Sequence, residues 1–326
     1  MTAAPITPTM DRSTAEVDRA LDRGHILALD GLRGIAILLV VACHFVSNLH
    51  MVATGWTTPF VIGAHAGWTG VDLFFVLSGF LITGILVDAR GSGSYFKAFY
   101  ARRALRIIPA YYGFLFVIFI ILPALHISAG DNAMLARQHQ SWYWLHLTNV
   151  MMALGEAGRG PYPSTLFWSL AVEEQFYLVW PAIVALCSVR VLRQVCLAGI
   201  VMCAGLRIVG ALADVPALTL SVLPFTRGDT LFVGGLLAIE YRRGTLDRYL
   251  SAVKFAAPLA AVTIVGLMIL YSELDYIDRG TAMFGTIAIT VLGASAVVIG
   301  ITAPGSAFAR ILPSGFLRFF GRYSYA

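Results

Sequence analysis

An aspartate, an arginine and a histidine lie within one apolar stretch near the start of the chain, residues 28–45. Each of them, Asp30, Arg33 and His44, is costly at membrane depth unless it faces protein or water. Arg33 and His44 are eleven residues apart, which on a helix places them within about 20° of one another and about 16 Å apart along the axis. One helix face therefore carries a permanent cation and, further along, an imidazole that can take and return a proton.

Each residue taken alone also has a structural explanation. Arg33 could snorkel at a helix end, with its charge in water and its stem along apolar surface. His44 could simply donate a hydrogen bond to a backbone carbonyl. Their position on one face favours a functional pair.

A second candidate site lies between residues 94 and 112, where arginines recur at helical spacing. Arg106 follows Arg102 and Arg103 by four and three residues, so the three side chains lie on neighbouring parts of one helix surface. Guanidinium groups bind phosphate oxygens in pairs, and such a cluster therefore suits a multiply phosphorylated ligand. The alternative is a topology anchor, because cytoplasmic loops of membrane proteins are rich in Lys and Arg.

A polar stripe runs along the otherwise apolar stretch 163–181. Ser169, Glu173 and Tyr177 recur every four residues and therefore share a helix face. Glu174 lies about 100° further round the helix, so the two carboxylates need not have the same role. One carboxylate could orient an imidazole and stabilise its protonated form. The alternative is a structural ion pair with an intramembrane arginine.

Further ionisable residues lie inside apolar runs, namely Asp72, Arg207, Arg227 and Asp229. Intramembrane charges are functional candidates by default. A structural alternative is that Arg227 and Asp229 neutralise one another, or that Arg207 or Arg227 pairs with a glutamate of the polar stripe. No charged residue occurs in the two last expected spans, so we expect the working site to be built from the earlier ones.

Composition places the chain among membrane proteins. Of its 326 residues 58% are hydrophobic and 13% are charged, and the mean hydropathy of +0.78 is too high for an ordinary soluble globule. The formal net charge is +5, but Lys and Arg fall in short clusters between apolar runs, which disfavours nucleic acid as a partner. The four cysteines have no metal-ligand spacing, and no metal site is expected.

The hydropathy pattern predicts an all-α polytopic transmembrane helix bundle with about eight complete spans, each needing about 20 mostly apolar residues. We place the spans near 26–48, 67–87, 107–125, 166–189, 195–213, 218–240, 255–271 and 281–302. The run 142–154 is too short for a comfortable crossing and is predicted to be a re-entrant or interfacial helix.

Loop charges predict the orientation of the bundle. With 142–154 not crossing, the basic loops and residues 1–24 all fall on one side, which the excess of Lys and Arg marks as cytoplasmic. We therefore expect a multi-pass protein of the cell (inner) membrane, surrounded by membrane lipids. Residues 1–24 are predicted to be a cytoplasmic N-terminal tail.

Five motifs together resemble those of the acyltransferase-3 family of integral membrane O-acyltransferases. They are Asp30-Gly-Leu-Arg33-Gly with its spacing to His44, Gly70-Val-Asp72-Leu-Phe-Phe-Val-Leu-Ser78-Gly79-Phe-Leu-Ile, Arg102-Arg103-x-x-Arg106-Ile-x-Pro109, Phe167-Trp-Ser-Leu-x-Val-Glu-Glu-x-Phe-Tyr and Arg227-Gly-Asp229. Family members usually continue past a Gly-x-x-Ser-Tyr segment with further membrane helices, whereas this sequence ends at Ala326. We therefore expect 25–326 to be a transmembrane acyltransferase domain that is shortened at its C-terminus.

The resemblance implies transfer of an acyl group, often acetyl, from acetyl-CoA or another acyl-CoA. The implied acceptor is a hydroxyl of a cell-envelope carbohydrate or of a small glycosylated or other small molecule. No permanently bound cofactor is expected. The resemblance implies that His44 and Arg33 are catalytic and that the Arg102, Arg103 and Arg106 cluster lies on the donor side. The candidate catalytic set also contains Glu173, Glu174 and Asp72, and the candidate binding set contains Asp30, Trp168, Ser169, Tyr177, Arg227 and Asp229.

In the simplest mechanism His44 is the general base on the acceptor hydroxyl, which attacks the thioester carbonyl directly. A carboxylate would set the tautomer of the imidazole, and an arginine or a backbone N–H would stabilise the oxyanion. The alternative route is an acyl-enzyme on His44. A transporter or flippase also places Arg, His and carboxylates inside a bundle, but only a transferase would consume the acyl donor.

Overall fold

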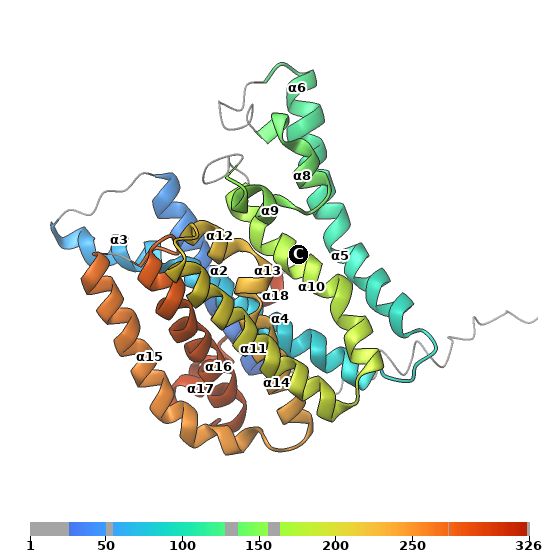
Figure 1. The fold of residues 1–326 in the computed structure, drawn as a ribbon, viewed down its shortest axis with the longest axis vertical. Coiled ribbons are helices and arrows are strands. Elements are labelled where there is room, and N and C mark those ends of the chain that lie inside the picture. Colours follow the sequence, from blue (N-terminus) through green and yellow to red (C-terminus); the bar gives the residue numbers. More distant parts are fainter. Residues whose placement is uncertain (1–25, 50–54, 128–135, 156–163, 273, 325–326) are drawn as a thin grey trace, which may run out of the picture.

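The computed structural model describes residues 26–49, 55–127, 136–155, 164–272 and 274–324, and the tail predicted at 1–24 lies outside them. The helices are α2 (Leu27–Asn48), α3 (Thr58–His65), α4 (Gly70–Asp88), α5 (Tyr95–Phe116), α6 (Leu122–Ala124), α8 (Gln140–Trp144), α9 (Thr148–Ala153), α10 (Ser164–Leu186), α11 (Val189–Leu212), α12 (Ala217–Val222), α13 (Pro224–Arg227), α14 (Asp229–Arg242), α15 (Leu250–Tyr271), α16 (Thr286–Thr302), α17 (Ala307–Ile311) and α18 (Gly315–Tyr323). Short helical turns η1 (Gly55–Thr57), η2 (Ala66–Thr69), η3 (Val117–Ile121), η4 (Leu246–Tyr249) and η5 (Thr281–Gly285) adjoin them. These described residues contain no strand (Figure 1).

Seven helical stretches among the described residues are long and apolar enough to cross a membrane. They are Leu27–Ser47, Gly55–Asp88, Tyr95–Ala124, Phe167–Leu186, Val189–Leu212, Leu246–Tyr271 and Thr281–Thr302. Each of them overlaps one of the spans predicted from hydropathy. The predicted polytopic helical bundle is therefore confirmed, and the number of single-helix spans is seven where about eight were expected.

The difference lies at the predicted span 218–240, which is divided among three helices. Pro224 begins α13, and Gly228 separates α13 from α14. Proline has no N–H to continue the preceding helix, so the segment cannot form one continuous span. The segment nevertheless returns the chain alongside α11, because Arg193 near the start of α11 bonds Glu240 near the end of α14 at 2.7 Å.

The predicted non-crossing run 142–154 forms the short helices α8 and α9. These two helices meet at His146, whose φ of 52° is left-handed and ends the first of them. The Tyr111 hydroxyl of α5 donates to the Tyr143 carbonyl at 2.8 Å, and the Tyr111 ring stacks on His146 at 4.1 Å. The run therefore packs on the end of α5 rather than forming a span of its own.

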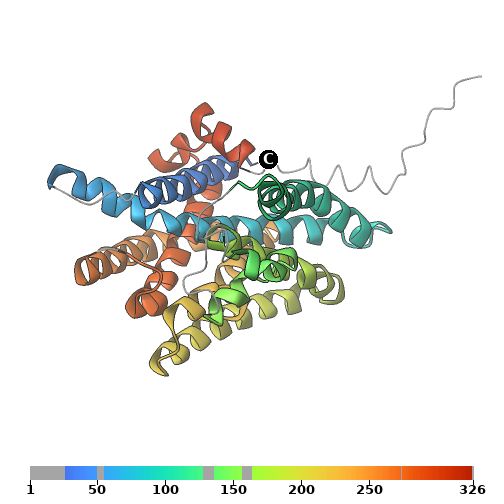
Figure 2. The same ribbon diagram turned by 90° about the horizontal axis from the view of Figure 1, so that it is seen from above.

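The main bundle is organised around α4, which contacts α14, α2, α16 and α10. A Cβ on Gly79 would lie 2.0 Å from the Leu231 carbonyl oxygen, and one on Gly234 would lie 2.0 Å from that of Val76. The backbones of α4 and α14 thus touch, which is how helices associate where lipid supplies no hydrophobic drive. Figure 2 shows α2 and the last helices of the chain, α17 and α18, on one side of α4, with α10 and α11 on the other.

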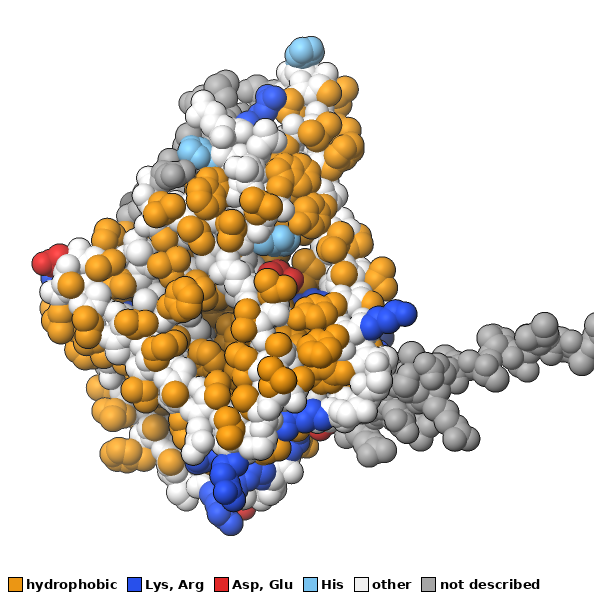
Figure 3. Space-filling model, turned by 45° about the vertical axis from the view of Figure 1, so that its right-hand side comes forward, with side chains coloured by type: hydrophobic (Ala, Val, Ile, Leu, Met, Phe, Trp, Pro, Cys, Tyr) orange, Lys and Arg blue, Asp and Glu red, His pale blue; other side chains and the backbone are white. Residues whose placement is uncertain are grey.

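Basic side chains gather at one end of the bundle, which we call the basic end. Arg242 at the end of α14 pairs with Asp88 at the end of α4, so both helices finish there. The Arg193–Glu240 pair lies at the same end of α14. Figure 3 shows a concentration of Lys and Arg at the bottom of the molecule, below a largely apolar face.

The C-terminal segment forms α18, which lies along α2 (Figure 1). The sequence predicted only the beginning of a further apolar helix here. Two close approaches hold α18 on α2, because a Cβ on Gly321 would lie 1.9 Å from the Asp30 carbonyl oxygen and one on Gly34 would lie 2.0 Å from that of Leu317. Glycines on both helices thus allow a contact that hydropathy does not reveal.

Candidate functional site

One face of α2 connects the two residues singled out first in the sequence. Arg33, Ile37, Val40 and His44 follow one another at spacings of four, three and four residues and form one stripe. Arg33 lines a cavity beside α18, which we call the α18 cavity. Ile37 and Val40 line a second cavity between α2, α4, α5 and α10, which we call the central cavity. The stripe therefore leads from the basic end past the central cavity to His44.

The α18 cavity has a volume of about 710 Å³ and is strongly basic. Its charged lining consists of Asp30, Arg33, Arg106, Arg318 and Arg322. Arg33 donates to Asp30 at 3.3 Å, which fixes the guanidinium at the wall of α2. Four arginines against one carboxylate favour an anion with several charges, since guanidinium forks match phosphate oxygens.

Two of these arginines do not belong to the candidate set predicted from the sequence. Arg318 and Arg322 follow the last candidate span, and the working site was expected from the earlier spans alone. The structure adds α18 to the candidate site, because this helix packs along α2 and lines the cavity. Their spacing of four residues, which puts both on one helix face, was the available signal.

The central cavity has a volume of about 520 Å³ and is mostly apolar. Apolar side chains from four helices line it, among them Ile37, Phe74, Ile107 and Phe167. Its polar lining comes from Ser78, Arg103, Arg106, Tyr111, Ser169, Glu173 and Ser324. A cavity of this size with a few convergent polar groups is typical of a small-molecule site.

The three arginines predicted as one cluster have different surroundings. Arg106 lines both the central cavity and the α18 cavity, and so stands at their junction. Arg103 turns toward α10, where its guanidinium carbon lies 3.7 Å from the centre of the Tyr177 ring. Arg102 lines a smaller recess of about 170 Å³ together with both of the others. The cluster therefore borders three hollows rather than one, with Arg106 in the lining of each.

Glu173 is held at the wall of the central cavity by α4 and α5. Ser78 of α4 donates to one of its carboxylate oxygens at 2.5 Å, and Tyr177 donates to the Ser78 hydroxyl at 2.8 Å. The other carboxylate oxygen lies 3.8 Å from a terminal nitrogen of Arg103. In the sequence Ser78 is only part of a motif, and its hydrogen bonds to Glu173 and Tyr177 make it a candidate site residue.

Glu174 shares Arg103 with Glu173 but does not line the central cavity. Its carboxylate lies 3.5 Å from Nε of Arg103. Pairing of these glutamates with Arg207 or Arg227, which the sequence left open, does not occur, because those arginines bind aspartates elsewhere. A structural ion pair does form, with α5 as the unexpected partner.

His44 lies one helical turn beyond the Val40 wall of the central cavity and is half-buried. Its Nδ1 donates to the Val40 carbonyl oxygen at 2.8 Å. A carbonyl only accepts, so the proton of the neutral ring is on Nδ1 and the lone pair is on Nε2. The expectation that a carboxylate sets this tautomer was wrong, because a backbone carbonyl of the same helix does so. Among the described residues no hydrogen bond reaches Nε2.

Asp72, Arg207, Arg227 and Asp229 form a fully enclosed charged layer. Arg227 bonds Asp72 at 2.8 Å, and Arg207 bonds Asp229 at 2.6 Å. The partners differ from the Arg227–Asp229 neutralisation considered from the sequence. Neither the central cavity nor the α18 cavity is lined by these residues. The layer therefore joins helices, and the structure does not bring Asp72 to the cavities as a catalytic carboxylate, nor Arg227 and Asp229 as binding groups.

Trp168 belongs to this layer rather than to a cavity. Its ring lies 5.9 Å from the Arg227 guanidinium and meets Phe75 edge to face at 6.2 Å. Ser169, the next residue, does line the central cavity. In the described parts of the chain, no group of three or more His, Cys, Asp or Glu side chains is placed to hold a metal ion.

Comparisons with known proteins identify a family and several relatives. A family model described as "Acyltransferase domain" matches residues 26–326. The chain is 36% identical over 166 residues to "Peptidoglycan O-acetyltransferase OatA" of Listeria monocytogenes, covering 49% of this chain and 24% of the relative. It is 28% identical over 318 residues to "O-acetyltransferase OatA" of Staphylococcus aureus, covering 93% of this chain and 49% of the relative. The chain thus spans between a quarter and a half of these relatives. No solved structure gives a significant match.

Proposed function

Because this chain belongs to the family defined by the Acyltransferase domain, we propose that it is a membrane O-acyltransferase. The acyl group is acetyl, the donor is acetyl-CoA, and the acceptor is a hydroxyl of a cell-envelope carbohydrate. The names of the relatives support acetyl transfer, and one of those names specifies peptidoglycan. The observation that carries the proposal is the position of Arg106, which lines a basic cavity and an apolar one at the same time.

The two cavities match the two halves of an acyl-CoA. The nucleotide half carries phosphates, which Arg33, Arg106, Arg318 and Arg322 of the α18 cavity would bind. The thioester half is a narrow, weakly polar arm, and the central cavity of about 520 Å³ has a mostly apolar wall that would hold it. Passing Arg106, the arm would carry the thioester carbonyl toward Glu173 and the Val40 wall.

In the mechanism that this geometry supports, Nε2 of His44 removes the proton of the acceptor hydroxyl. The hydroxyl oxygen forms the new C–O bond at the thioester carbonyl, the C–S bond breaks, and the thiolate takes the proton back from the imidazolium. Arg103 faces the central cavity and is held by Glu173, so it is placed to stabilise the oxyanion. The alternative route, in which the same Nε2 is acylated first, would use the same tautomer.

The orientation that we propose puts the basic end in the cytoplasm of the cell (inner) membrane. Lys and Arg are enriched on the cytoplasmic side of membrane proteins, and acetyl-CoA would enter the α18 cavity from there. The N-terminus of α2 lies toward the basic end, because Ala28 and Leu32 pack with Leu246 of η4. The N-terminus of the protein is then cytoplasmic, and the acceptor arrives from the side of His44.

Reporter fusions should locate the two ends of the bundle. We expect fusions after Arg90, Arg193 and Arg243 to give cytoplasmic signals and a fusion after Asp275 to give an external one. The physical reason is that Arg90 and Arg243 follow the ends of α4 and α14 and Arg193 lies near the start of α11, all at the basic end. The 274–278 loop instead packs at the opposite end, where Trp68 donates to the Leu274 carbonyl. Paired alkaline phosphatase and green fluorescent protein fusions measure this. A cytoplasmic signal at Asp275 would contradict the proposed orientation.

Removing Arg318 and Arg322 together, by Arg318→Gln and Arg322→Gln, should raise KM for acetyl-CoA by about 10-fold or more. Hydrogen bonds to charged groups contribute about 1.5–3 kcal/mol each, and about 1.4 kcal/mol corresponds to a factor of ten. The measurement is release of free CoA thiol and transfer of labelled acetyl to a peptidoglycan fragment, in membranes that contain the protein. A short acetyl thioester without the nucleotide should show little change in KM.

The matched control is Arg310→Gln on the neighbouring α17, which is exposed and lines neither cavity. Equal losses with both donors would show that the α18 arginines do not bind the nucleotide half. If membranes with the unaltered protein consumed no acetyl-CoA at all, the transferase proposal itself would fail, and the transporter alternative would gain support.

A further inference from the structure

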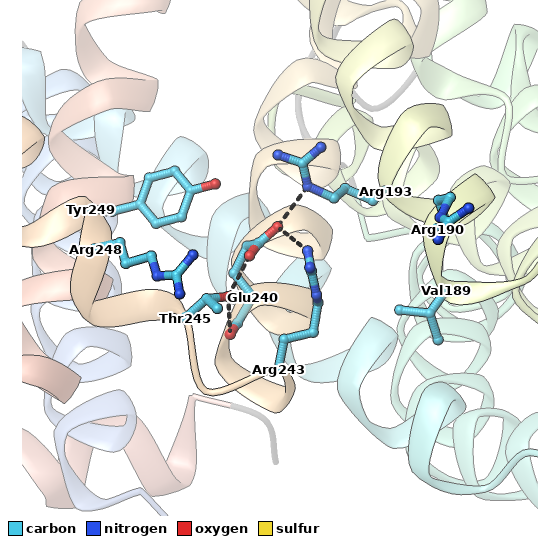
Figure 4. Close-up of a pocket in the computed structure, with 8 residues that line it drawn as sticks. All are labelled: Val189, Arg190, Arg193, Glu240, Arg243, Thr245, Arg248 and Tyr249. Carbon is cyan, nitrogen blue, oxygen red and sulfur yellow. Dashed lines mark hydrogen bonds and ion pairs between the residues drawn. The ribbon is translucent and has the colours of Figure 1, made fainter.

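A second basic pocket lies at the basic end, between α11, α14 and η4 (Figure 4). It has a volume of about 620 Å³, and it shares no lining residue with the central cavity or the α18 cavity. Its charged and polar lining consists of Arg190, Arg193, Arg243, Arg248, Glu240, Thr245 and Tyr249. We call it the α11 pocket. The proposed acyl transfer leaves this pocket without a role.

A buried glutamate organises the α11 pocket. Glu240 is only 3% exposed, and one of its carboxylate oxygens accepts from Nε of Arg193 at 2.7 Å and from Arg243 at 3.3 Å. Its other oxygen accepts from the Thr245 hydroxyl at 2.5 Å. Both oxygens of the carboxylate thus accept hydrogen bonds from residues of the pocket wall. Its effect is to fix two guanidinium groups from different helices in one place before any ligand arrives.

The pocket keeps a surplus of positive charge after this pairing. Arg190 and Arg248 form no ion pair with any described residue. Nε of Arg193 donates to Glu240, and Figure 4 shows that the terminal nitrogens of Arg193 point away from that carboxylate. Arg193 and Arg243 remain 37% and 49% exposed, so both side chains can still reach a ligand in the pocket. Four arginines from three segments therefore surround one carboxylate that is already neutralised.

The type and arrangement of the four cations indicate a phosphate-binding site and not only a cluster that sets membrane orientation. Membrane orientation requires only that cytoplasmic loops contain more Lys and Arg, and either residue in any arrangement meets that requirement. Here all the cations are arginine, they converge on one hollow, and a buried acid holds two of them in position. Planar forks of this kind bind two phosphate oxygens at once, which an ammonium group cannot do.

We propose that the α11 pocket binds a phosphate group at the basic end of the protein, separately from the acyl donor. The same chemistry is presented by the headgroup of an anionic phospholipid and by a soluble polyphosphate. Arg190 and Arg248 supply the uncompensated charge, and Arg193 and Arg243 supply the fixed part of the site. The proposal does not depend on acyl transfer, because it uses neither cavity of that site.

The test uses the full chain in nanodiscs of phosphatidylcholine, with two probes. One probe is cardiolipin, added to the nanodiscs at a low mole fraction, with lipid retained by the protein counted by native mass spectrometry. The other is sodium pyrophosphate, titrated in solution and followed by calorimetry. The pocket variant is Arg190→Gln with Arg248→Gln, which leaves the contacts of Glu240 intact. The control is Lys254→Gln with Arg310→Gln, which removes the same charge from exposed positions outside the pocket.

We expect the unaltered protein and the control to bind at least one probe saturably, and the pocket variant to bind it about 10-fold more weakly or worse, as expected for lost charged hydrogen bonds. Retention of cardiolipin alone identifies a lipid headgroup, and binding of pyrophosphate alone identifies a soluble ligand. Equal weakening in the pocket variant and the control would overturn the proposal, since charge rather than the pocket would then decide binding. Absence of saturable binding to both probes would overturn it too.

Discussion

Replacing His44 by alanine should lower acyl transfer by about 10²–10⁴-fold, which is the usual contribution of a general base. The protein should stay in the membrane at its normal level, because the side chain is half-buried and, within the described part of the chain, bonds only a carbonyl of its own helix. The lost group is Nε2, the atom that would take the proton of the acceptor hydroxyl. The measurement is the initial rate of acetyl transfer per amount of membrane-inserted protein.

Two further variants separate chemistry from packing at this position. His44→Asn keeps an N–H at the position of Nδ1, where it can still donate to the Val40 carbonyl, but it cannot act as a base, so it should be as inactive as His44→Ala. Phe45→Ala removes the neighbouring side chain, which is 58% exposed, and should leave the rate nearly unchanged. Activity of His44→Ala above about a tenth of the original rate would exclude an essential base, given the magnitude expected for one.

Replacing Arg227 by methionine should destabilise the fold by about 3–5 kcal/mol, the usual cost of leaving a buried charge without its partner. Asp72 would lose its ion pair at 2.8 Å, and both side chains are fully buried. The expected result is a marked loss of folded protein from the membrane. Thermal unfolding of the purified protein in detergent, together with membrane levels, measures the change.

The structure offers both a rescue and a control for this prediction. Adding Asp72→Asn to Arg227→Met removes the second charge, and replacing both members of a buried pair is often nearly neutral. The double variant should therefore recover most of the lost stability. Arg279→Met breaks an exposed pair with Asp214, whose members are 51% and 82% exposed, and should cost no more than about 1 kcal/mol. If the double variant were as unstable as the single one, the charge layer would not be the reason for the loss.

The sequence by itself determined the class of the protein and the features that repeat within one helix. Apolar runs of sufficient length predicted a polytopic bundle, which the seven candidate spans confirm. The helical period put Arg33 and His44 on one face of α2, and the structure places the wall of the central cavity between them. Both inferences depend only on residues close in the chain, so no packing was needed to make them.

Only the tertiary structure decided which helices meet and which charges pair. Arg227 bonds Asp72 across 155 residues of sequence, and Glu173 faces Arg103 of α5 rather than an arginine of a later span. α18 forms one wall of the α18 cavity because glycines allow it to pack closely on α2. The length of the apolar run at residues 316–326 did not predict this contact. The physical reason is that periodicity assigns a face to each helix, whereas close approach at glycines and the cost of an unpaired buried charge select the partner of that face.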